Sequence, residues 1–283
     1  MADLENVGRR GTQRTENPRL GKRSGIAWLR NEHWLTVLII LIVLGIWEFL
    51  AGFGYISALF FPPPSKILTS LYLMFARGSI YPNLKASLIR LFAGFCLGCI
   101  PGLLIGWAMG WSPRLGEIVD PIVAALHPLP KIAMFPLIMI IFGIGEISKV
   151  VAVSIAVFFP MIINSMAGVR QINPLLFEVS QNYGANLFKT FARVVVPGSL
   201  PMVLAGARIA INLAMVITIA VEIVSANQGL GVMIWFAWQT LRVEELYACL
   251  IITGLLGIMI NFSIQKLTLL IIPWYHPKTV EEY

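Results

Sequence analysis

The sequence predicts an all-α, polytopic membrane protein with six transmembrane helices. Of its 283 residues 58% are apolar and only 12% are charged, about half the charged share of an average soluble domain. The apolar residues also gather in stretches long enough to cross the hydrocarbon core of a bilayer, which takes roughly 20 residues in a helix. Six such stretches cover residues 35–53, 88–111, 119–142, 149–168, 202–224 and 247–271.

A basic arm, residues 1–30, precedes the first stretch and carries much of the net charge of +7. Nucleic-acid binding is one interpretation of such an arm. We favour another, because an excess of basic residues beside the first span holds that end of the chain in the cytoplasm. Residues 1–25 are poor in apolar side chains, so we expect disorder there. The basic residues of the arm are Arg9, Arg10, Arg14, Arg19, Lys22, Arg23 and Arg30.

The orientation of the amino terminus fixes the side on which every connection lies. Six crossings of the transmembrane domain, residues 31–272, return the tail 273–283 to the cytoplasm. The segment at about 170–200 is then cytoplasmic, whereas 61–91 and 225–246 lie outside. We predict a proline turn and a short amphipathic helix for the first outer segment. The second is predicted to be a re-entrant or interfacial element with Trp235 and Trp238 at the headgroup level, and both are candidate docking surfaces for an external partner.

The second span carries glycine at every fourth position. This spacing keeps the glycines near one face of a helix and leaves a stripe without side chains, so another helix can approach closely. Such close contact is a main source of attraction between helices in lipid. The pattern therefore predicts tight packing, either within one subunit or between two. We call it the glycine stripe: Gly94, Gly98, Gly102, Gly106 and Gly110.

Four prolines interrupt the third span: Pro121, Pro128, Pro130 and Pro136. Each proline frees a carbonyl that must find another partner, which argues against a straight helix facing lipid. Broken helices of this kind border water-filled cavities or other protein helices, so this span is the strongest indication of a translocation path. A histidine beside a kink, such as His127, is still more often a packing residue than a ligand.

Polar residues inside spans tend to face the interior of the helix bundle. Asn164 in the fourth span is the best placed to face a central cavity. Arg208 lies close to the inner end of the fifth span, where its side chain can snorkel, and Glu222 lies near the outer end, where partial hydration is expected. The candidates for the translocation path are His127, Pro130, Met134, Asn164 and Thr218.

The cytoplasmic segment has apolar residues at three- and four-residue spacing, which is typical of one helical face. Gly184 interrupts the pattern, and Pro197 and Pro201 are expected to end the helix before the fifth span. We therefore predict two short helices bent at Gly184, with the apolar face packed on the spans and a polar face in the cytosol. A helix resting at the lipid interface is the alternative. The apolar residues are Leu176, Val179, Tyr183, Leu187, Phe191 and Val194, and the polar ones are Glu178, Gln181 and Asn182.

Sequence motifs for catalysis are absent from the chain. It has no GxxxxGK[ST] phosphate loop, no HExxH and no GxSxG. The three histidines are scattered and the three cysteines lie in apolar runs, so we expect neither a metal site nor redox chemistry. Cys96 and Cys99 are interpreted as small packing residues. Any nucleotide chemistry must then be supplied by another chain.

Residues 178–197 resemble the cytoplasmic signature of the permease subunits of ATP-binding-cassette (ABC) importers, which reads EAA, three residues, Gly, nine residues, Ile-x-Leu-Pro. The matching positions are Glu178-Val179-Ser180, Gly184 and 194–197, with equal spacing and conservative changes of residue. Four further stretches resemble the nitrate, sulfonate, taurine and bicarbonate branch of these permeases: FFPPPSKI (60–67), PLPKIAMFPLIMIIFGIGEISK (128–149), FFPMIINSMAGV (158–169) and EIVSANQGLG (222–231).

The resemblance implies a type I ABC importer permease fold and a homodimer in a bacterial inner membrane. Each copy would dock on one cytoplasmic ATPase subunit, which binds ATP and Mg, and an external substrate-binding protein would deliver the cargo. The cargo would be a small anion such as nitrate, bicarbonate, taurine or an aliphatic sulfonate, and the branch also carries aromatic acids and pyrimidine precursors. The implied contacts with the ATPase are Glu178, Gln181, Asn182, Gly184, Ala185 and Pro197.

Two other classes of protein compete with this reading. An integral-membrane enzyme would need a cluster of His, Asp or Glu at one membrane face, and the sequence offers none. A membrane scaffold would account for the glycine stripe but not for the spacing of the cytoplasmic signature. We therefore expect a permease subunit with no ATPase site of its own and no nucleic-acid partner.

Overall fold

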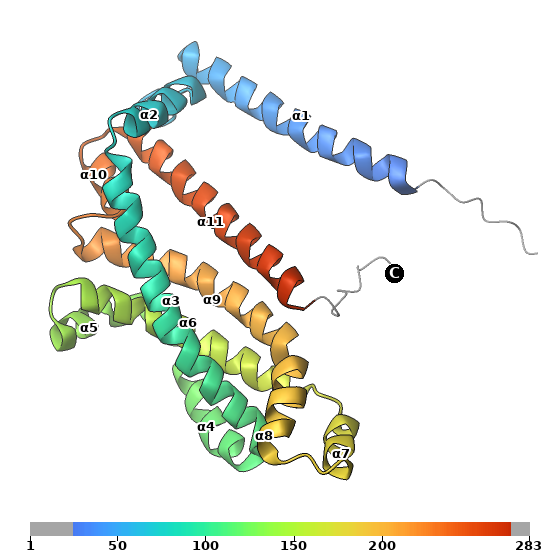
Figure 1. Cartoon of the computed structure of the whole chain (residues 1–283). Coiled ribbons are helices and arrows are strands. Elements are labelled where there is room, and N and C mark those ends of the chain that lie inside the picture. The colour runs from blue at the N-terminus through green and yellow to red at the C-terminus, as the bar shows by residue number, and fades with distance from the viewer. Residues whose placement is uncertain (1–24, 273–283) are drawn as a thin grey trace, which may run out of the picture. The chain divides into compact units, whose positions relative to one another are not determined.

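The computed structural model describes residues 25–272, and every regular element in that range is a helix (Figure 1). The chain divides into two units, residues 1–49 and 50–283, and each is described by itself. The first unit holds most of α1 (Gly25–Gly52), whose apolar part, Trp34–Gly52, is long enough to cross a membrane. The predicted arm therefore ends inside a helix. The rest of the arm, and the predicted tail 273–283, lie outside the described residues.

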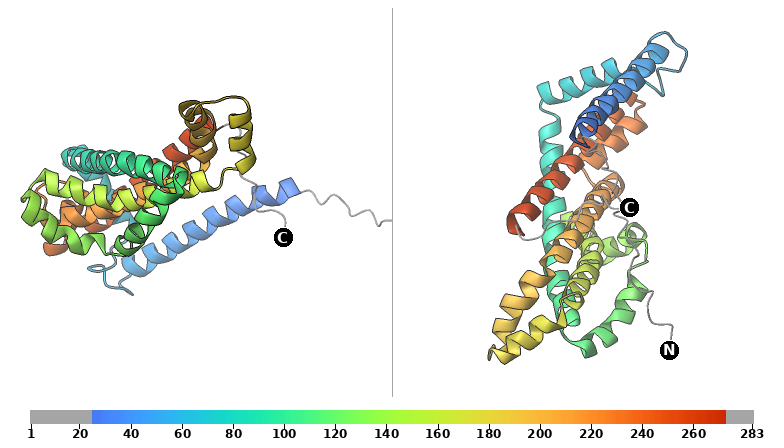
Figure 2. Two further views of the ribbon diagram at one scale, coloured as in Figure 1. Left: turned by 90° about the horizontal axis from the view of Figure 1, so that it is seen from below. Right: turned by 90° about the vertical axis from the view of Figure 1, so that its right-hand side faces the viewer.

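The second unit contains the remaining helices (Figure 2). Four stretches of this unit are long and apolar enough to span, which makes five with α1. The pair α4 and η1–α5 is bent by 85°, and counting it as one broken span gives the six spans that the sequence predicts. The elements are α2 (Pro64–Ala76), α3 (Ile80–Trp111), α4 (Pro113–Leu126), η1 (Lys131–Met134), α5 (Phe135–Phe142), α6 (Glu146–Arg170), α7 (Pro174–Asn182), α8 (Leu187–Thr190), η2 (Phe191–Val195), α9 (Val196–Ser225), α10 (Leu230–Gln239) and α11 (Val243–Ile271).

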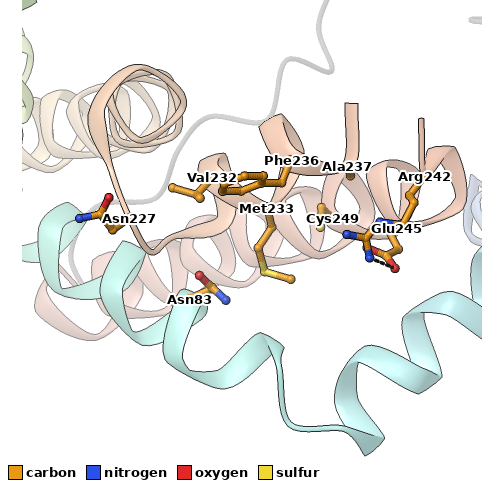
Figure 3. Close-up of a pocket in the computed structure, with 9 residues that line it drawn as sticks. All are labelled: Asn83, Asn227, Val232, Met233, Phe236, Ala237, Arg242, Glu245 and Cys249. Carbon is orange, nitrogen blue, oxygen red and sulfur yellow. Dashed lines mark hydrogen bonds and ion pairs between the residues drawn. The ribbon is translucent and has the colours of Figure 1, made fainter. Parts of the chain in front are cut away.

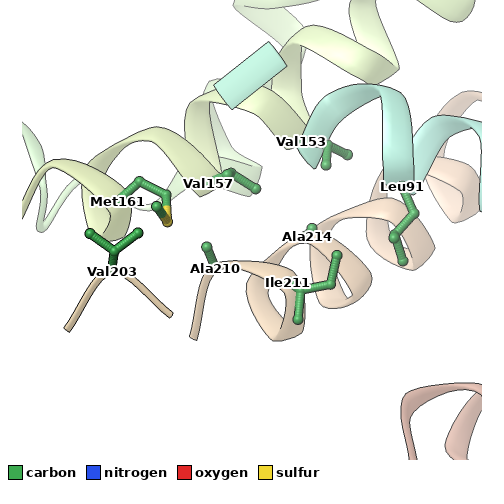
Figure 4. Packing of buried hydrophobic residues seen from close by; sticks show 8 residues of the cluster. All are labelled: Leu91, Val153, Val157, Met161, Val203, Ala210, Ile211 and Ala214. Carbon is green, nitrogen blue, oxygen red and sulfur yellow. The ribbon is translucent and has the colours of Figure 1, made fainter. Parts of the chain in front are cut away.

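Three helices, α3, α6 and α9, form the centre of this unit and make its most extensive mutual contacts. Their apolar side chains meet in one cluster, to which α3 contributes Leu91 and the other two helices contribute the remainder (Figure 4). Because these side chains are removed from lipid as well as from water, packing rather than the hydrophobic effect holds the helices together. The buried members of the cluster are Leu91, Val153, Val157, Met161, Val203, Ala210, Ile211 and Ala214.

The glycine stripe lies on the face of α3 that contacts α6 in the same chain. A Cβ atom added to Gly98 would lie 2.2 Å from the carbonyl oxygen of Ser154, and one on Gly106 would lie 2.5 Å from that of Ile162. The other three glycines of the stripe face α6 just as closely. An added Cβ would lie less than 3.0 Å from an atom of Val153, Phe158 or Val169, for Gly94, Gly102 and Gly110 respectively. The sequence leaves open whether the stripe packs within one subunit or between two. In the structure it packs against a helix of the same subunit.

The two connections predicted to lie outside the membrane contain short helices. After Pro63, α2 begins with Pro64, whose missing N–H is tolerated in the first turn of a helix. The second connection contains α10, which buries Leu230 and Val232, and its Trp235 and Trp238 rings lie 4.8 Å apart. We call the end of the unit that carries α2 and α10 the α10 end, and the end that carries α7 the α7 end (Figure 1).

The prediction that Pro197 and Pro201 end the helix before the fifth span is wrong. The helical stretch from Leu187 to Ser225 is continuous through α8, η2 and α9 and is 39 residues long. The backbone N–H of Val196 bonds to the carbonyl of Phe191, five residues earlier, so the chain makes a wider π-helical turn just before Pro197. Pro197 then stands in the first turn of α9, where a residue without an N–H is tolerated.

Candidate functional site

The connection between α6 and α9, residues 171–190, carries the predicted coupling residues at the α7 end. The side chain of Asn173 accepts a hydrogen bond from the N–H of Leu175, and Pro174 occupies the first turn, so both residues favour a helix start here. At the other end, the hydroxyl groups of Ser180 and Thr190 lie 2.7 Å apart and join α7 to α8. The connection is thus an ordered structure with fixed ends.

Gly184 lies in the turn after α7 rather than inside a helix. Its φ of +68° is in the left-handed region, which L residues with a side chain adopt only at a cost. The N–H of Ala185 bonds to the carbonyl of Ser180 at 3.0 Å, which closes the end of α7. A short helix, α7, precedes Gly184 as predicted, but the helix that follows is the start of the 39-residue stretch Leu187–Ser225, and the glycine reverses the chain rather than bending one continuous helix.

Phe191, one member of the predicted apolar row, packs on the span α3, but over α7, the turn and the start of α8 the prediction of packing on the spans is wrong. The turn at Gly184 divides the apolar row between α7 and α8, so its members no longer share one helical face. Tyr183 is 88% exposed and Leu187 is 78% exposed. Leu176 and Val179 are exposed as well. These side chains lie beside the polar Glu178, Gln181 and Asn182, which are also exposed, and together they form a mixed surface that we call the α7 surface.

The broken span has its break between α4 and η1, where Pro128 and Pro130 lie. The Nζ atom of Lys131 donates hydrogen bonds to the carbonyls of Leu126 and His127 at the end of α4, where the last carbonyls have no partner within the helix itself; that of Leu126 also accepts one from the N–H of Leu129. The same ammonium group lies 4.9 Å from the centre of the Phe159 ring on α6. Lys131 therefore closes the end of α4 and fixes the break against a neighbouring helix.

The predicted path residues fall in two places. His127 and Pro130 are exposed at the break, and Met134 packs nearby, against the cluster of Phe135, Ile138, Ala152 and Val221. Asn164 of α6 packs against α9: a Cβ atom added to Gly206 of α9 would lie 2.5 Å from the Cβ atom of Asn164. Thr218 is buried and donates its hydroxyl hydrogen to the carbonyl of Ala214. The role of all five in a translocation path stays a prediction.

A group of charged residues at the α10 end, three of them buried and the fourth, Glu146, exposed, is not found by the sequence analysis. Glu222 of α9 has no exposed surface, so the expectation of partial hydration is wrong. Its carboxylate accepts hydrogen bonds from Ser87, from Arg90 at 2.7 Å and from the backbone N–H of Gly231 at 2.9 Å. Both oxygens of this buried carboxylate therefore have hydrogen-bond donors, which offset the cost of removing a polar group from water.

Arg90 is the centre of this group, and its side chain is 5% exposed. Besides Glu222 it binds both carboxylate oxygens of Glu146, at 2.5 and 2.9 Å, and the carbonyl of Gln228 at 2.6 Å. Glu146 also accepts a hydrogen bond from Lys149 at 3.1 Å. We call these four charged residues, Arg90, Glu146, Lys149 and Glu222, the charge cluster; it joins α3, α6, α9 and the loop before α10.

The close approach of Glu222 to the start of α10 explains two glycines, Gly229 just before the helix and Gly231 in its first turn. A Cβ atom on Gly229 would lie 2.3 Å from the Cδ atom of Glu222, and one on Gly231 would lie 2.7 Å from its Cβ atom. The sequence signal that could have found this site is a pair of opposite charges, Arg90 and Glu222, inside two predicted spans, since charges in a span usually pair with one another. Among residues 25–272, no group of three or more His, Cys, Asp or Glu could hold a metal ion.

A pocket with a volume of about 320 Å³ lies between α3, α10 and α11 at the same end (Figure 3). Asn83 and Asn227 line one side of it, and Phe236 lies along its apolar part. Arg242 and Glu245 form an ion pair at 3.0 Å on the far side. The pocket is therefore polar at both sides and apolar between them.

Comparison with known proteins supplies the context for these sites. The family model described as binding-protein-dependent transport system inner membrane component matches residues 102–276. The taurine transport system permease protein TauC of Escherichia coli (strain K12) is 30% identical over 246 residues, which is 85% of this chain and 90% of TauC. The putative aliphatic sulfonates transport permease protein SsuC of the same organism is 32% identical over 240 residues, which is 83% of this chain and 91% of SsuC.

The fold is also similar to that of a solved structure. A chain of the MetNI methionine ABC transporter, in an inward-facing conformation, matches 67% of this chain and 94% of its own length with a TM-score of 0.58. The sequence identity is 20%, so this likeness concerns the fold alone.

Proposed function

The chain belongs to the family of binding-protein-dependent transport system inner membrane components and is a multi-pass transport permease of the ABC type, and we propose that it imports taurine or an aliphatic sulfonate. The observation that carries this choice of cargo is the similarity to taurine and sulfonate permeases over more than four-fifths of the chain. Both cargoes carry a compact sulfonate anion. Other small anions, such as nitrate and bicarbonate, are competitors in the experiment below.

The proposed working complex contains two copies of this permease, two cytoplasmic ATPase subunits and an external substrate-binding protein. ATP and Mg would bind to the ATPase subunits, since this chain has no phosphate loop. The membrane is the bacterial inner membrane, with both termini in the cytoplasm. In this orientation the α7 end faces the ATPase subunits and the α10 end faces the binding protein.

The α7 surface is the proposed docking site for the ATPase. It combines exposed Leu176, Val179 and Tyr183 with the polar Glu178 and Gln181. Exposed apolar and aromatic side chains beside polar ones are typical of a protein interface. Of the other coupling candidates, Asn182 ends α7, Gly184 and Ala185 make the turn, and Pro197 lies at the start of α9.

The α10 end is the proposed docking site for the external binding protein. It offers α2, the pocket beside Asn83 and the exposed ion pair of Arg242 and Glu245. Cargo released at this end would pass along the broken span, near His127, Pro130 and Met134, and past Asn164 and Thr218. The path itself would be completed by the second copy of the chain.

The test is transport by the whole complex in proteoliposomes. We expect ATP-dependent uptake of labelled taurine or of an aliphatic sulfonate when the permease, its ATPase and the binding protein are all present. Uptake at full rate without the ATPase would contradict the ABC mechanism. Uptake of nitrate or bicarbonate in preference to any sulfonate would contradict only the choice of cargo.

A further inference from the structure

The longest helix of the described chain has an interruption close to the α7 end. Residues 191–195 make a π-helical turn, and Pro197 and Pro201 follow within the next two turns. Each proline lacks the N–H that would bind a carbonyl one turn earlier, so this part of the helix has fewer backbone hydrogen bonds than the rest. Bends in long helices occur at such places, and in Figure 1 the chain changes direction between α8 and the main part of α9.

Aromatic side chains from α3 contact this interruption on both of its sides. The Phe191 ring is stacked on that of Trp111, with centres 5.1 Å apart, and meets the edge of Trp107 at 5.5 Å. Trp107 also donates a hydrogen bond from Nε1 to the hydroxyl of Ser199 at 3.0 Å, and Ser199 is fully buried. Phe191 begins the π-helical turn and Ser199 lies beyond it, between Pro197 and Pro201, so α3 is attached to the helix on both sides of the π-helical turn.

The same contacts connect the α7 surface to the centre of the fold. The Ser180 and Thr190 hydroxyls join α7 to α8, and Phe191 is the residue that follows Thr190. On the other side, Trp107 and Trp111 each follow directly after a glycine of the stripe, and these glycines leave no space between α3 and α6. A continuous series of contacts therefore runs from α7 through Phe191 to α3 and α6.

We propose that Phe191, Trp107, Trp111 and Ser199 form a joint that passes movement of the α7 surface to α3 and α6, and this inference rests on the proposed function. Without the joint, a displacement of α7 would be taken up by bending at the π-helical turn. With it, the displacement moves α3, and the glycine stripe makes α6 follow. The four residues are positioning residues, because they act on the path through helices and contact neither cargo nor nucleotide.

Two variants remove the ring contacts and keep an apolar side chain of moderate size: Phe191→Leu and Trp111→Leu. We expect the complete reconstituted complex to hydrolyse ATP but to move about tenfold less cargo per ATP, since an aromatic pair contributes an interaction of this order. Trp107→Phe keeps a ring and removes the N–H donor, so a fall of about threefold is expected. The measurement is the ratio of cargo taken up to ATP hydrolysed in proteoliposomes.

Matched controls separate the joint from general damage. Phe262→Leu is the same substitution on α11, where the ring contacts Lys266 and no residue of the joint, and it should leave the ratio unchanged. Phe191→Tyr keeps the ring and should preserve coupling. If the leucine variants cannot be purified as complexes, the Trp107→Phe variant decides, and an unchanged ratio overturns the joint.

The outcomes distinguish this inference from the function on which it rests. A wild-type ratio in Phe191→Leu and Trp111→Leu, with ATP-dependent uptake by the wild type, overturns the joint and leaves the importer function standing. Equal falls in Phe191→Leu and Phe262→Leu also overturn it. A wild-type complex without ATP-dependent uptake overturns the importer function and the joint together.

Discussion

At the scale of single residues, Glu222 shows how a carboxylate is held inside a helix bundle. It has no exposed surface, and its oxygens are occupied by Ser87, Arg90 and the N–H of Gly231. Removing one partner of a buried ion pair leaves the other charge without compensation, and that loss is larger than the net contribution of the pair. A glutamate in an exposed ion pair at the surface would contribute little to the stability of the fold.

We therefore expect Glu222→Ala to lower the free energy of unfolding by about 3–5 kcal/mol, because Arg90 loses a buried partner. Glu222→Gln keeps an acceptor for Ser87 and should cost less. The control is Arg242→Ala, which breaks an exposed pair whose loss should cost less than about 1 kcal/mol. Thermal unfolding of the detergent-purified protein measures all three, and equal losses for Glu222→Ala and Arg242→Ala would contradict the role of burial.

Gly184 provides a second prediction at this scale. No atom lies within 4 Å of an added Cβ, so a side chain has room, although its positive φ costs about 1–2 kcal/mol for a residue other than glycine. Gly184→Trp should leave membrane insertion intact and abolish uptake, because the indole would stand between the α7 surface and the ATPase. Gly54→Trp has a similar φ and equally open space but lies far along the chain, and it should retain uptake. Normal uptake in Gly184→Trp would exclude the α7 surface as the docking site.

At the scale of the helices, the glycine stripe sets the distance between α3 and α6. A Cβ on Gly98 would overlap the carbonyl oxygen of Ser154, which belongs to the backbone of α6 and cannot move without the whole helix. The stripe thus makes the two helices one mechanical element. The joint at Phe191 acts on this element. Trp107 lies between Gly106 and Gly110, the last two glycines of the stripe, and Trp111 directly follows Gly110.

Gly98→Ala should lower the free energy of unfolding by about 1–3 kcal/mol, as expected for overpacking. Gly254→Ala is the control, because no atom lies within 4 Å of its added Cβ and alanine is the better helix former by about 1 kcal/mol. Unfolding of the two purified variants should therefore shift in opposite directions. A stabilised Gly98→Ala protein would show that α3 and α6 are not in close contact.

The helices also show where sequence reasoning stops. The apolar stretches, the broken third span and the close-packing glycines were predicted, because each is a local pattern of residue types. The continuous helix through Pro197 was not, because no local pattern of residue types predicts the π-helical turn that precedes the proline. Glu222 was misjudged for a similar reason, since its partners Ser87 and Arg90 are more than 130 residues away in the sequence.

At the scale of the whole molecule, the proposed orientation assigns the two ends of the second unit to opposite sides of the membrane. Tyr183 is 88% exposed at the α7 end, and Tyr72 on α2 is 70% exposed at the α10 end. In the proposed orientation, these two exposed side chains lie on opposite sides of the membrane.

With Tyr183→Cys, we expect a membrane-impermeant thiol reagent to label inside-out vesicles and not intact cells. With Tyr72→Cys, we expect the reverse. The parent protein should first have Cys96, Cys99 and Cys249 replaced by alanine, so that only the introduced thiol reacts. Labelling of Tyr183→Cys in intact cells would place the α7 surface outside and would contradict docking on a cytoplasmic ATPase.

The charge cluster has one consequence for an energised membrane. Arg90 and Lys149 contribute two positive charges and Glu146 and Glu222 two negative ones, so the cluster as a whole is neutral. Moving a single charge through 100 mV takes about 2.3 kcal/mol, whereas a neutral group moves without electrical work. Any displacement of these helix ends across the membrane would therefore take no electrical work on account of the cluster, in a polarised cell as in a depolarised one.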